Sequence, residues 1–125
     1  MNRRNFIQKI GLASLAVSAC SLANAKEGNQ KMYGLIVKIN AAPNERDNLI
    51  SILLEGTTDM PGCISYVIAK DTGDENSLWI TEVWKDQASH QASLSLPSVQ
   101  AAIVKGRPLI AGFGERHITE PIGVN

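Results

Sequence analysis

The side chains most suited to chemistry lie in and just after the segment SLWITEVW. Glu82 alternates with apolar neighbours along an expected strand, Trp84 ends that strand, and Tyr66 lies on the strand before it. A carboxylate on a mostly apolar face is either paired, with Arg116 or Lys38, or carries a raised pKa that suits a general base. The ion pair is the favoured reading for Glu82, and core packing is the favoured reading for Trp84 and Tyr66. Glu82 and Trp84 are the catalytic candidates.

Tyr66 and Trp84 line the predicted substrate pocket, and His90 and Ser93 follow on the next expected helix. Three residues turn a helix by about 300°, so His90 and Ser93 are neighbours on its surface. For His90 alone, a solvated position on the helix surface is favoured over a place in the pocket.

Two basic residues stand side by side on the last expected strand. Arg116 and His117 must point to opposite faces of the sheet, because side chains alternate along a strand. The sequence leaves open which of the two faces the pocket.

The remaining residues predict no cofactor, no metal and no nucleic-acid partner. Two distant histidines and two cysteines offer no ligand spacing, and AGFGE is not followed by a helix as a phosphate loop would be. Without residues 1–25 the chain keeps nine basic and twelve acidic residues, a net charge of −3, with no basic stripe for phosphates.

The first 25 residues have the pattern of an export signal. Arg3, Arg4 and Lys9 precede a weakly apolar run that is too short to span a bilayer, and the paired arginines resemble a twin-arginine leader. Cleavage after Ala25 is favoured and gives a periplasmic protein. The alternative is a lipobox that ends at Cys20, whose acylation would anchor the protein to the membrane.

After a linker at 26–31, the residues predict one ferredoxin-like domain at 32–118, followed by a C-terminal tail at 119–125. Alternation, caps and turn residues give an α+β order, β-α-β-β-α-β, with a short extra helix before the last strand. The expected strands are 32–39, 63–71, 77–84 and 109–118, and Gly112 and Gly114 predict a bulge or bend in the last of them. Asn44 and Asp86 are the expected caps of the first two helices, and the third is expected at 98–106. Ala88, Ala92 and Leu96 recur every four residues in the second helix until Pro97 interrupts it.

The four-stranded antiparallel sheet that this order predicts has two apolar faces. The helices cover one face, while Trp79, Thr81 and Val83 point to the other, which is also mostly apolar. For a chain this short, the simplest cover is a second copy, so we expect a homodimer.

In combination, PGCISYVIAKD, LWITEVWKD and the small-residue helix that follows resemble the antibiotic biosynthesis monooxygenase (ABM) family over residues 32–118. The resemblance implies a dimeric α/β barrel and, in some members, oxygenation of quinols or anthrone-like polyketides by dioxygen without metal or flavin. Many members carry a histidine where this chain has Ser93, so the resemblance places Ser93, and with it the neighbouring His90, in the substrate pocket. Haem-degrading relatives are disfavoured, because Ile103 replaces their iron ligand.

Together these features predict an exported, cofactor-independent monooxygenase that oxidises a small quinol or hydroxyaromatic. The alternative is a non-catalytic, small-molecule-binding or stress-related protein on the same dimeric scaffold.

Overall fold

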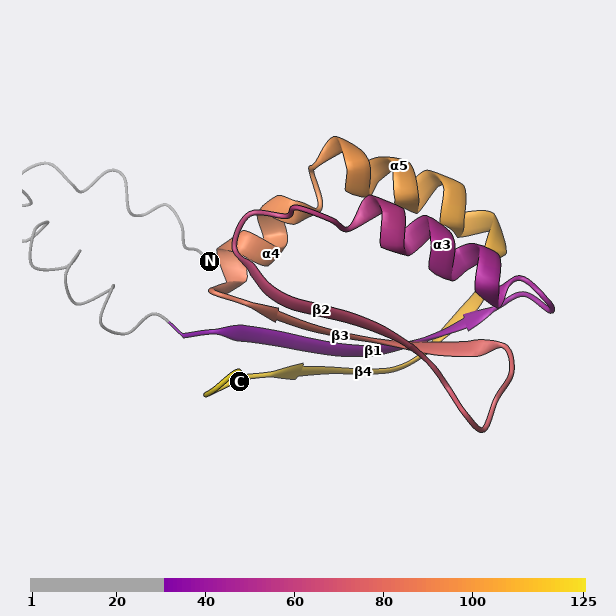
Figure 1. The fold of residues 1–125 in the computed structure, drawn as a ribbon, viewed down its shortest axis with the longest axis horizontal. Helices are drawn as coiled ribbons and strands as arrows, with labels where there is room; N and C mark the ends of the chain where they lie inside the picture. Colours follow the sequence, from indigo (N-terminus) through magenta and orange to yellow (C-terminus); the bar gives the residue numbers. More distant parts are fainter. Residues whose placement is uncertain (1–30) are drawn as a thin grey trace, which may run out of the picture. The chain divides into compact units, whose positions relative to one another are not determined.

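The computed structural model of the 125-residue chain describes residues 31–125, and the expectations for the leader and for Cys20 lie outside this part. Within residues 31–125, no helix is long and apolar enough to cross a membrane. The elements follow one another as drawn in Figure 1: β1 (Tyr33–Ala41), α3 (Arg46–Gly56), β2 (Cys63–Lys70), β3 (Ser77–Trp84), α4 (Gln87–Ser93), α5 (Pro97–Gly106), the 3₁₀ turn η1 (Arg107–Leu109) and β4 (Ile110–Thr119).

The four strands form one antiparallel sheet in the order β2-β3-β1-β4, and the helices lie on one face of it (Figure 1). This confirms the predicted α+β, ferredoxin-like class; the sheet of a single chain is open and not closed into a barrel. The pairing of β1 with β4 shifts register twice, near Gly112. The glycines had predicted such an irregularity, because glycine in a strand often marks a bulge.

Local signals fix the helix ends, with two differences from expectation. Asn44 does not cap α3: its φ is 68°, in the left-handed region, and the helix begins at Arg46. Asp86 does cap α4, and its side chain accepts a hydrogen bond from the Ser89 amide at 2.8 Å. α4 ends at Ser93, earlier than the four-residue spacing of Ala88, Ala92 and Leu96 suggested.

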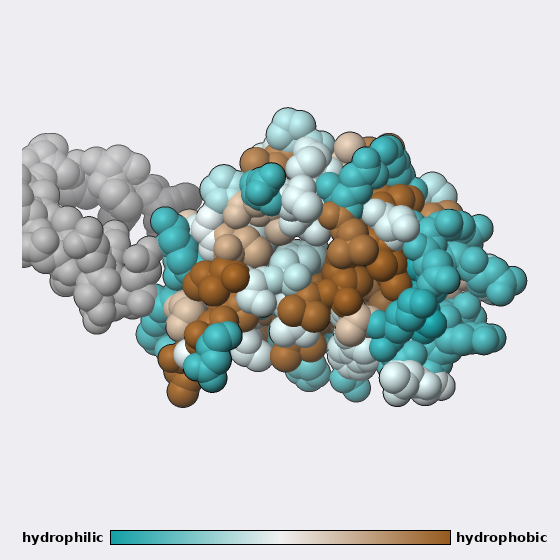
Figure 2. Space-filling view, in the orientation of Figure 1, coloured by the Kyte–Doolittle hydropathy of each residue, from teal (hydrophilic) through white to brown (hydrophobic). Residues whose placement is uncertain are grey.

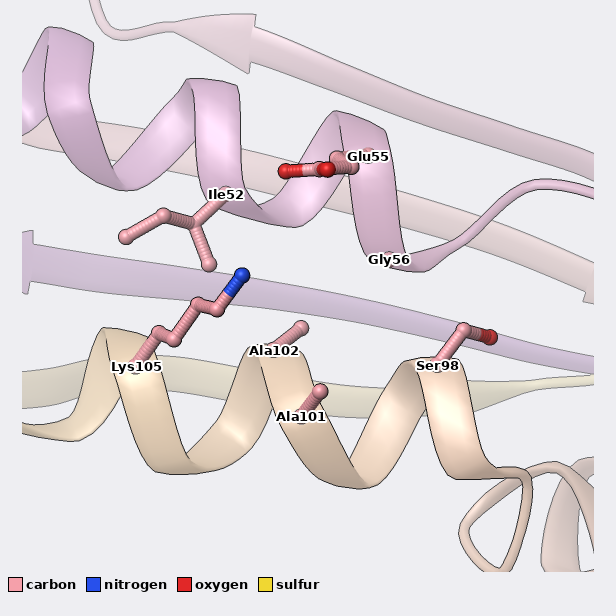
Figure 3. Close-up of a pocket in the computed structure, with 7 residues that line it drawn as sticks. All are labelled: Ile52, Glu55, Gly56, Ser98, Ala101, Ala102 and Lys105. Carbon is pink, nitrogen blue, oxygen red and sulfur yellow. The ribbon is translucent and has the colours of Figure 1, made fainter.

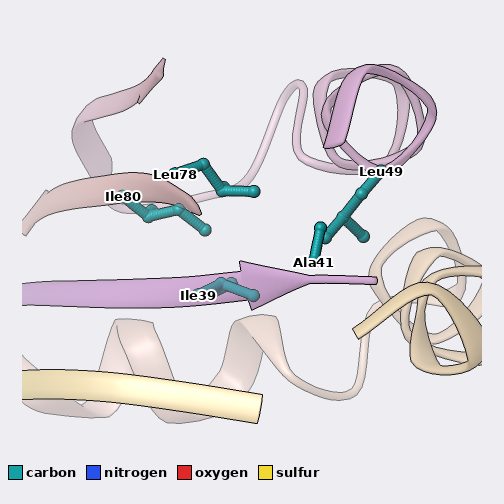
Figure 4. Packing of buried hydrophobic residues seen from close by; sticks show 5 residues of the cluster. All are labelled: Ile39, Ala41, Leu49, Leu78 and Ile80. Carbon is teal, nitrogen blue, oxygen red and sulfur yellow. The ribbon is translucent and has the colours of Figure 1, made fainter. Parts of the chain in front are cut away.

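One apolar cluster joins α3 to the middle of the sheet. Leu49 is fully buried and points from α3 towards Ala41 at the end of β1 (Figure 4). Ile39, Leu78 and Ile80 complete the cluster from β1 and β3. Full burial of one such side chain favours folding by about 1.5–3 kcal/mol, so the cluster holds the helix layer on the sheet.

α3 and α5 pack closely because small residues meet between them. A side chain at Gly56 would lie 2.5 Å from Cβ of Ala102, so only glycine allows this approach. Figure 3 shows the shallow groove of about 240 Å³ that remains between the two helices, where the Lys105 side chain extends towards α3. The helix pair therefore forms one rigid layer over half of the sheet.

Candidate functional site

The site begins on β3, which, like β1, is paired on both sides within the sheet. Glu82 lies opposite Leu35 of β1 and Tyr66 of β2, while Trp84 lies opposite Tyr33 and Cys63. Directly paired residues place their side chains on the same face. Leu78 and Ile80 share this face with Glu82 and belong to the helix-covered core, so Glu82 projects beneath the helices.

Glu82 is a buried carboxylate with two aromatic contacts. The Trp84 indole N–H donates a hydrogen bond of 2.8 Å to Oε1 of Glu82. Nε2 of His90 lies 3.8 Å from the same oxygen, which is too far for a hydrogen bond. The side chain of Glu82 is only 9% exposed, and Trp84 is 1% exposed, so the three groups meet away from bulk water.

The expectation of a solvated His90 is wrong, because its side chain is only 12% exposed. The imidazole lies edge-on to Trp84, with ring centroids 5.6 Å apart. It also lies against Tyr33, at 5.2 Å between centroids. Nδ1 of His90 is buried and has no hydrogen-bond partner within residues 31–125, although buried polar atoms in proteins are usually paired.

Sequence reasoning missed Tyr33. The residue stands at the start of β1, where composition predicts only a strand, and its role follows from its pairing with Trp84 across the β1·β3 ladder. That register could have been inferred by aligning the apolar faces of the two strands, which would have placed an aromatic ring beside Trp84.

The two remaining predicted pocket residues support the site in different ways. The Ser93 hydroxyl donates to the His90 carbonyl at 2.6 Å, so it stabilises the last turn of α4. Tyr66 is half-buried and packs against the cluster that contains Trp84. Tyr66, Glu82, Trp84, His90 and Ser93 thus all lie at the α4 end of the sheet.

The register of β4 settles which basic residue faces the helix layer. Arg116 pairs with Val37, which pairs in turn with Ile80, so Arg116 lies on the same face as Glu82. His117 lies on the opposite face, where Nε2 is 3.6 Å from a carboxylate oxygen of Glu115. The positive charge of Arg116 influences the pKa of Glu82, yet no ion pair within 4.0 Å joins them.

Lys38 cannot be the partner of Glu82. It pairs with Trp79 on the face away from the helices, and its ammonium lies 5.8 Å from the centre of the Trp79 ring. The predicted structural ion pair is therefore wrong in both of its proposed forms, and the indole N–H is the closest polar contact that Glu82 makes.

Burial dominates the electrostatics of the site. Desolvation raises the pKa of Glu82, although the Trp84 hydrogen bond and the Arg116 charge act in the opposite direction. Desolvation lowers the pKa of His90, and Arg116 adds to that effect, so the imidazole is held neutral. The pKa of Tyr66 is raised by burial and by the charge of Glu82, which keeps its phenol protonated.

Cys63 lies at the edge of this cluster. Its thiol donates a 3.6 Å hydrogen bond to the Ser65 carbonyl, and burial together with the charge of Glu82 raises its pKa. A thiol in this setting stays protonated and is a poor nucleophile. Within residues 31–125, no group of three or more His, Cys, Asp or Glu side chains could hold a metal ion.

A buried carboxylate of raised pKa, a neutral imidazole with one free nitrogen and a nearby guanidinium can together move a proton and hold an anion. The surrounding rings of Tyr33, Tyr66 and Trp84 supply surfaces that aromatic ligands prefer.

Comparison with known proteins identifies the family to which the chain is similar. The family described as antibiotic biosynthesis monooxygenase matches residues 32–105. A crystal structure of a protein from Chloroflexus aurantiacus assigned to that family is 60% identical, covers 75% of this chain and 96% of its own, and gives a TM-score of 0.74.

More distant similarities support the fold alone. A protein from Caulobacter crescentus with the same assignment is 17% identical, covers 82% of this chain and 99% of its own, and has a TM-score of 0.64. An uncharacterized protein from Synechocystis sp. is 27% identical over 94 residues, which are 73% of this chain. The match spans 64% of that relative's length.

The family match covers more than half of the chain, and a relative of 60% identity shares the whole domain. The chain therefore belongs to the antibiotic biosynthesis monooxygenase family.

Proposed function

We propose that the protein is a cofactor-independent monooxygenase that inserts one atom of dioxygen into a small quinol or similar hydroxyaromatic. The observation that carries the proposal is the buried Glu82, which meets the Trp84 indole at 2.8 Å and the His90 imidazole at 3.8 Å. A carboxylate held in such surroundings is a stronger base than one in water, because its protonated form is favoured.

The chemistry needs no electron source besides the substrate. Glu82 takes the proton of a hydroxyl group, and the resulting oxyanion passes one electron to dioxygen, which gives superoxide and a substrate radical. The two radicals join through a new carbon–oxygen bond, and protonation yields a hydroperoxide. Cleavage of the O–O bond, with loss of the carbon-bound hydrogen as a proton, leaves a hydroxyquinone and one molecule of water.

Each polar group has a distinct part in this sequence. Nδ1 of His90 forms a hydrogen bond with the substrate oxygen or with the peroxide. The guanidinium of Arg116 stabilises the oxyanion. The protonated phenol of Tyr66 is a further donor. Trp84 orients Glu82 through its indole N–H and shields the radical pair from water.

A second candidate function is non-catalytic binding of a small aromatic molecule. It is favoured by Ser93, which stands where many family members carry a histidine and whose hydroxyl is engaged by the helix backbone. The same rings and the same buried carboxylate would then serve recognition alone.

Replacement of Glu82 distinguishes the oxygenase function from non-catalytic binding. We expect Glu82→Gln to lower kcat with a responsive quinol by about 10²-fold or more, because the amide cannot accept the proton. The wild-type rate should rise as pH increases through the raised pKa of Glu82, and this step should vanish in the variant. The measurement is oxygen uptake in metal-free buffer, corrected for autoxidation of the quinol.

Glu115→Gln is the matched control, because Glu115 is an exposed carboxylate on β4 and should leave turnover unchanged. Absence of turnover above autoxidation across a panel of quinols, together with retained binding of those quinols, would support the non-catalytic function instead.

We also propose that two copies pack through the sheet face that the helices leave open. Ile36, Trp79 and Val83 on that face are only partly buried, and Val67 is exposed. Figure 2 views the molecule from the side, and its brown apolar patches lie beside this face and are not part of it. A second copy packed on the open face would remove its apolar side chains from water, as family members do in forming a dimeric barrel.

Light scattering of the mature protein at micromolar concentration should give twice the protomer mass. Val67→Asp should shift the protein towards monomer, because the substitution places a charge in the buried interface. The control variant Val104→Asp, on the outer side of α5, should remain a dimer. A monomeric wild-type protein would rule out this assembly.

Finally, we propose export to the periplasm through the leader at residues 1–25, with Arg3 and Arg4 read by the twin-arginine pathway. Replacement of both arginines by lysine should leave the precursor in the cytoplasm on cell fractionation. Unchanged export would exclude that pathway, and incorporation of labelled palmitate that depends on Cys20 would show a membrane-anchored form instead of cleavage after Ala25.

A further inference from the structure

A cavity of about 490 Å³ lies between the helix pair and the edge of the sheet formed by β1 and β4. Its walls come from α3, α5, η1 and β4, and they include Leu53, Ile103, Ile110 and Phe113. It lies beyond Ile39, which is four residues, or about 13 Å, along β1 from the residue opposite Glu82. The cavity is therefore separate from the site around Glu82, although Ile103 lines the cavity and also packs against the cluster that contains Trp84.

We propose that this cavity binds an apolar monocarboxylate, with the carboxylate on Arg107 at the rim and the apolar part between the helix layer and Phe113. The volume falls within the range of small-molecule sites, which is about 300–1,000 Å³. This inference does not rest on the oxygenation chemistry, and nothing in that chemistry requires a ligand here.

The charge of the lining indicates an anion. Arg107 is the only ionisable residue that lines the cavity, and no salt bridge within residues 31–125 engages it. A guanidinium beside an apolar surface binds a planar carboxylate through two parallel hydrogen bonds. A cationic or neutral ligand of the same shape would leave this group unpaired.

The position of Arg107 favours a ligand with one negative charge over a ligand with two. Arg107 directly follows α5, so the cavity lies at the carbonyl end of that helix, where the helix dipole is negative. One carboxylate is compensated by one guanidinium, but a phosphate dianion would also meet this unfavourable field. The backbone amides that usually bind phosphate at the start of a helix do not face this cavity.

Phe113 supplies the apolar contact at the mouth. The ring is 67% exposed although its strand neighbour Ile39 is buried in the core, and both residues line the cavity. A ligand chain laid between Phe113 and the side chains of Leu53 and Ile103 would cover this ring. The exposure of Phe113 and the unpaired Arg107 are thus explained by one amphipathic ligand.

The test uses decanoate as the probe, below its micellar concentration, with 1-decanol and decylamine as uncharged and cationic probes of equal length. Calorimetry should show saturable binding of decanoate to the mature protein, at least about tenfold tighter than 1-decanol, and no binding of decylamine. Amide shifts in NMR spectra should place the ligand at Gly106 and Gly112, which border the cavity.

Arg107→Gln should weaken the binding of decanoate by about tenfold or more and leave the binding of 1-decanol unchanged. Phe113→Ala should weaken the binding of both probes. Lys105→Gln is the matched control: this cation lies two residues earlier on α5, lines the other groove, and should have no effect. Equal affinity for decanoate and decanol, or no effect of Arg107→Gln, would overturn the assignment of charge recognition.

Failure of the two proposals can be told apart. Glu82→Gln should retain full decanoate affinity, since the Glu82 carboxylate lies outside the cavity. A wild-type protein that binds decanoate but oxidises no quinol would contradict only the oxygenase function. Absence of any decanoate binding to a folded protein would overturn the present proposal and leave oxygenation untouched.

Discussion

The burial of one carboxylate beneath the helix layer is the constraint on which the rest of the site depends. Glu82 has apolar strand neighbours, and its one close hydrogen bond within residues 31–125 comes from the Trp84 indole. Removal of a carboxylate from water is costly unless it is compensated. The Trp84 indole and the charge of Arg116 compensate only in part, so the raised pKa of Glu82 follows directly from its burial in the fold.

Much of the fold could be predicted from the sequence, because the signals are local. β-branched and aromatic residues predict β1, and Asp86 caps α4 as expected. α5 begins at Pro97, one residue before the expected start at Ser98. Asn44 is the exception. Asparagine is a good helix cap, but this residue adopts the left-handed conformation in the turn before α3. Glu82 and Trp84 could also be selected from the sequence, because both carry polar groups on a mostly apolar face of the strand.

The rest of the site could not be predicted because it depends on contacts between segments far apart in the chain. The burial of His90 arises from the way α4 packs over Tyr33 and Trp84, which no spacing within the helix reveals. The side of the sheet that Arg116 occupies depends on the register of β4, which is irregular near its start. Helical periodicity placed His90 beside Ser93 but could not tell which ring would lie above it.

The most direct test of this account is the pKa of Glu82, measured by NMR titration of the ¹³C-labelled side-chain carboxyl in the folded protein. Incomplete compensation of a buried charge predicts a value above 4.5, the ordinary pKa of a glutamate side chain, and a titration that Glu82→Gln abolishes. A value at or below 4.5 would show that the carboxylate is fully stabilised, as in a structural ion pair, and would contradict its assignment as the base.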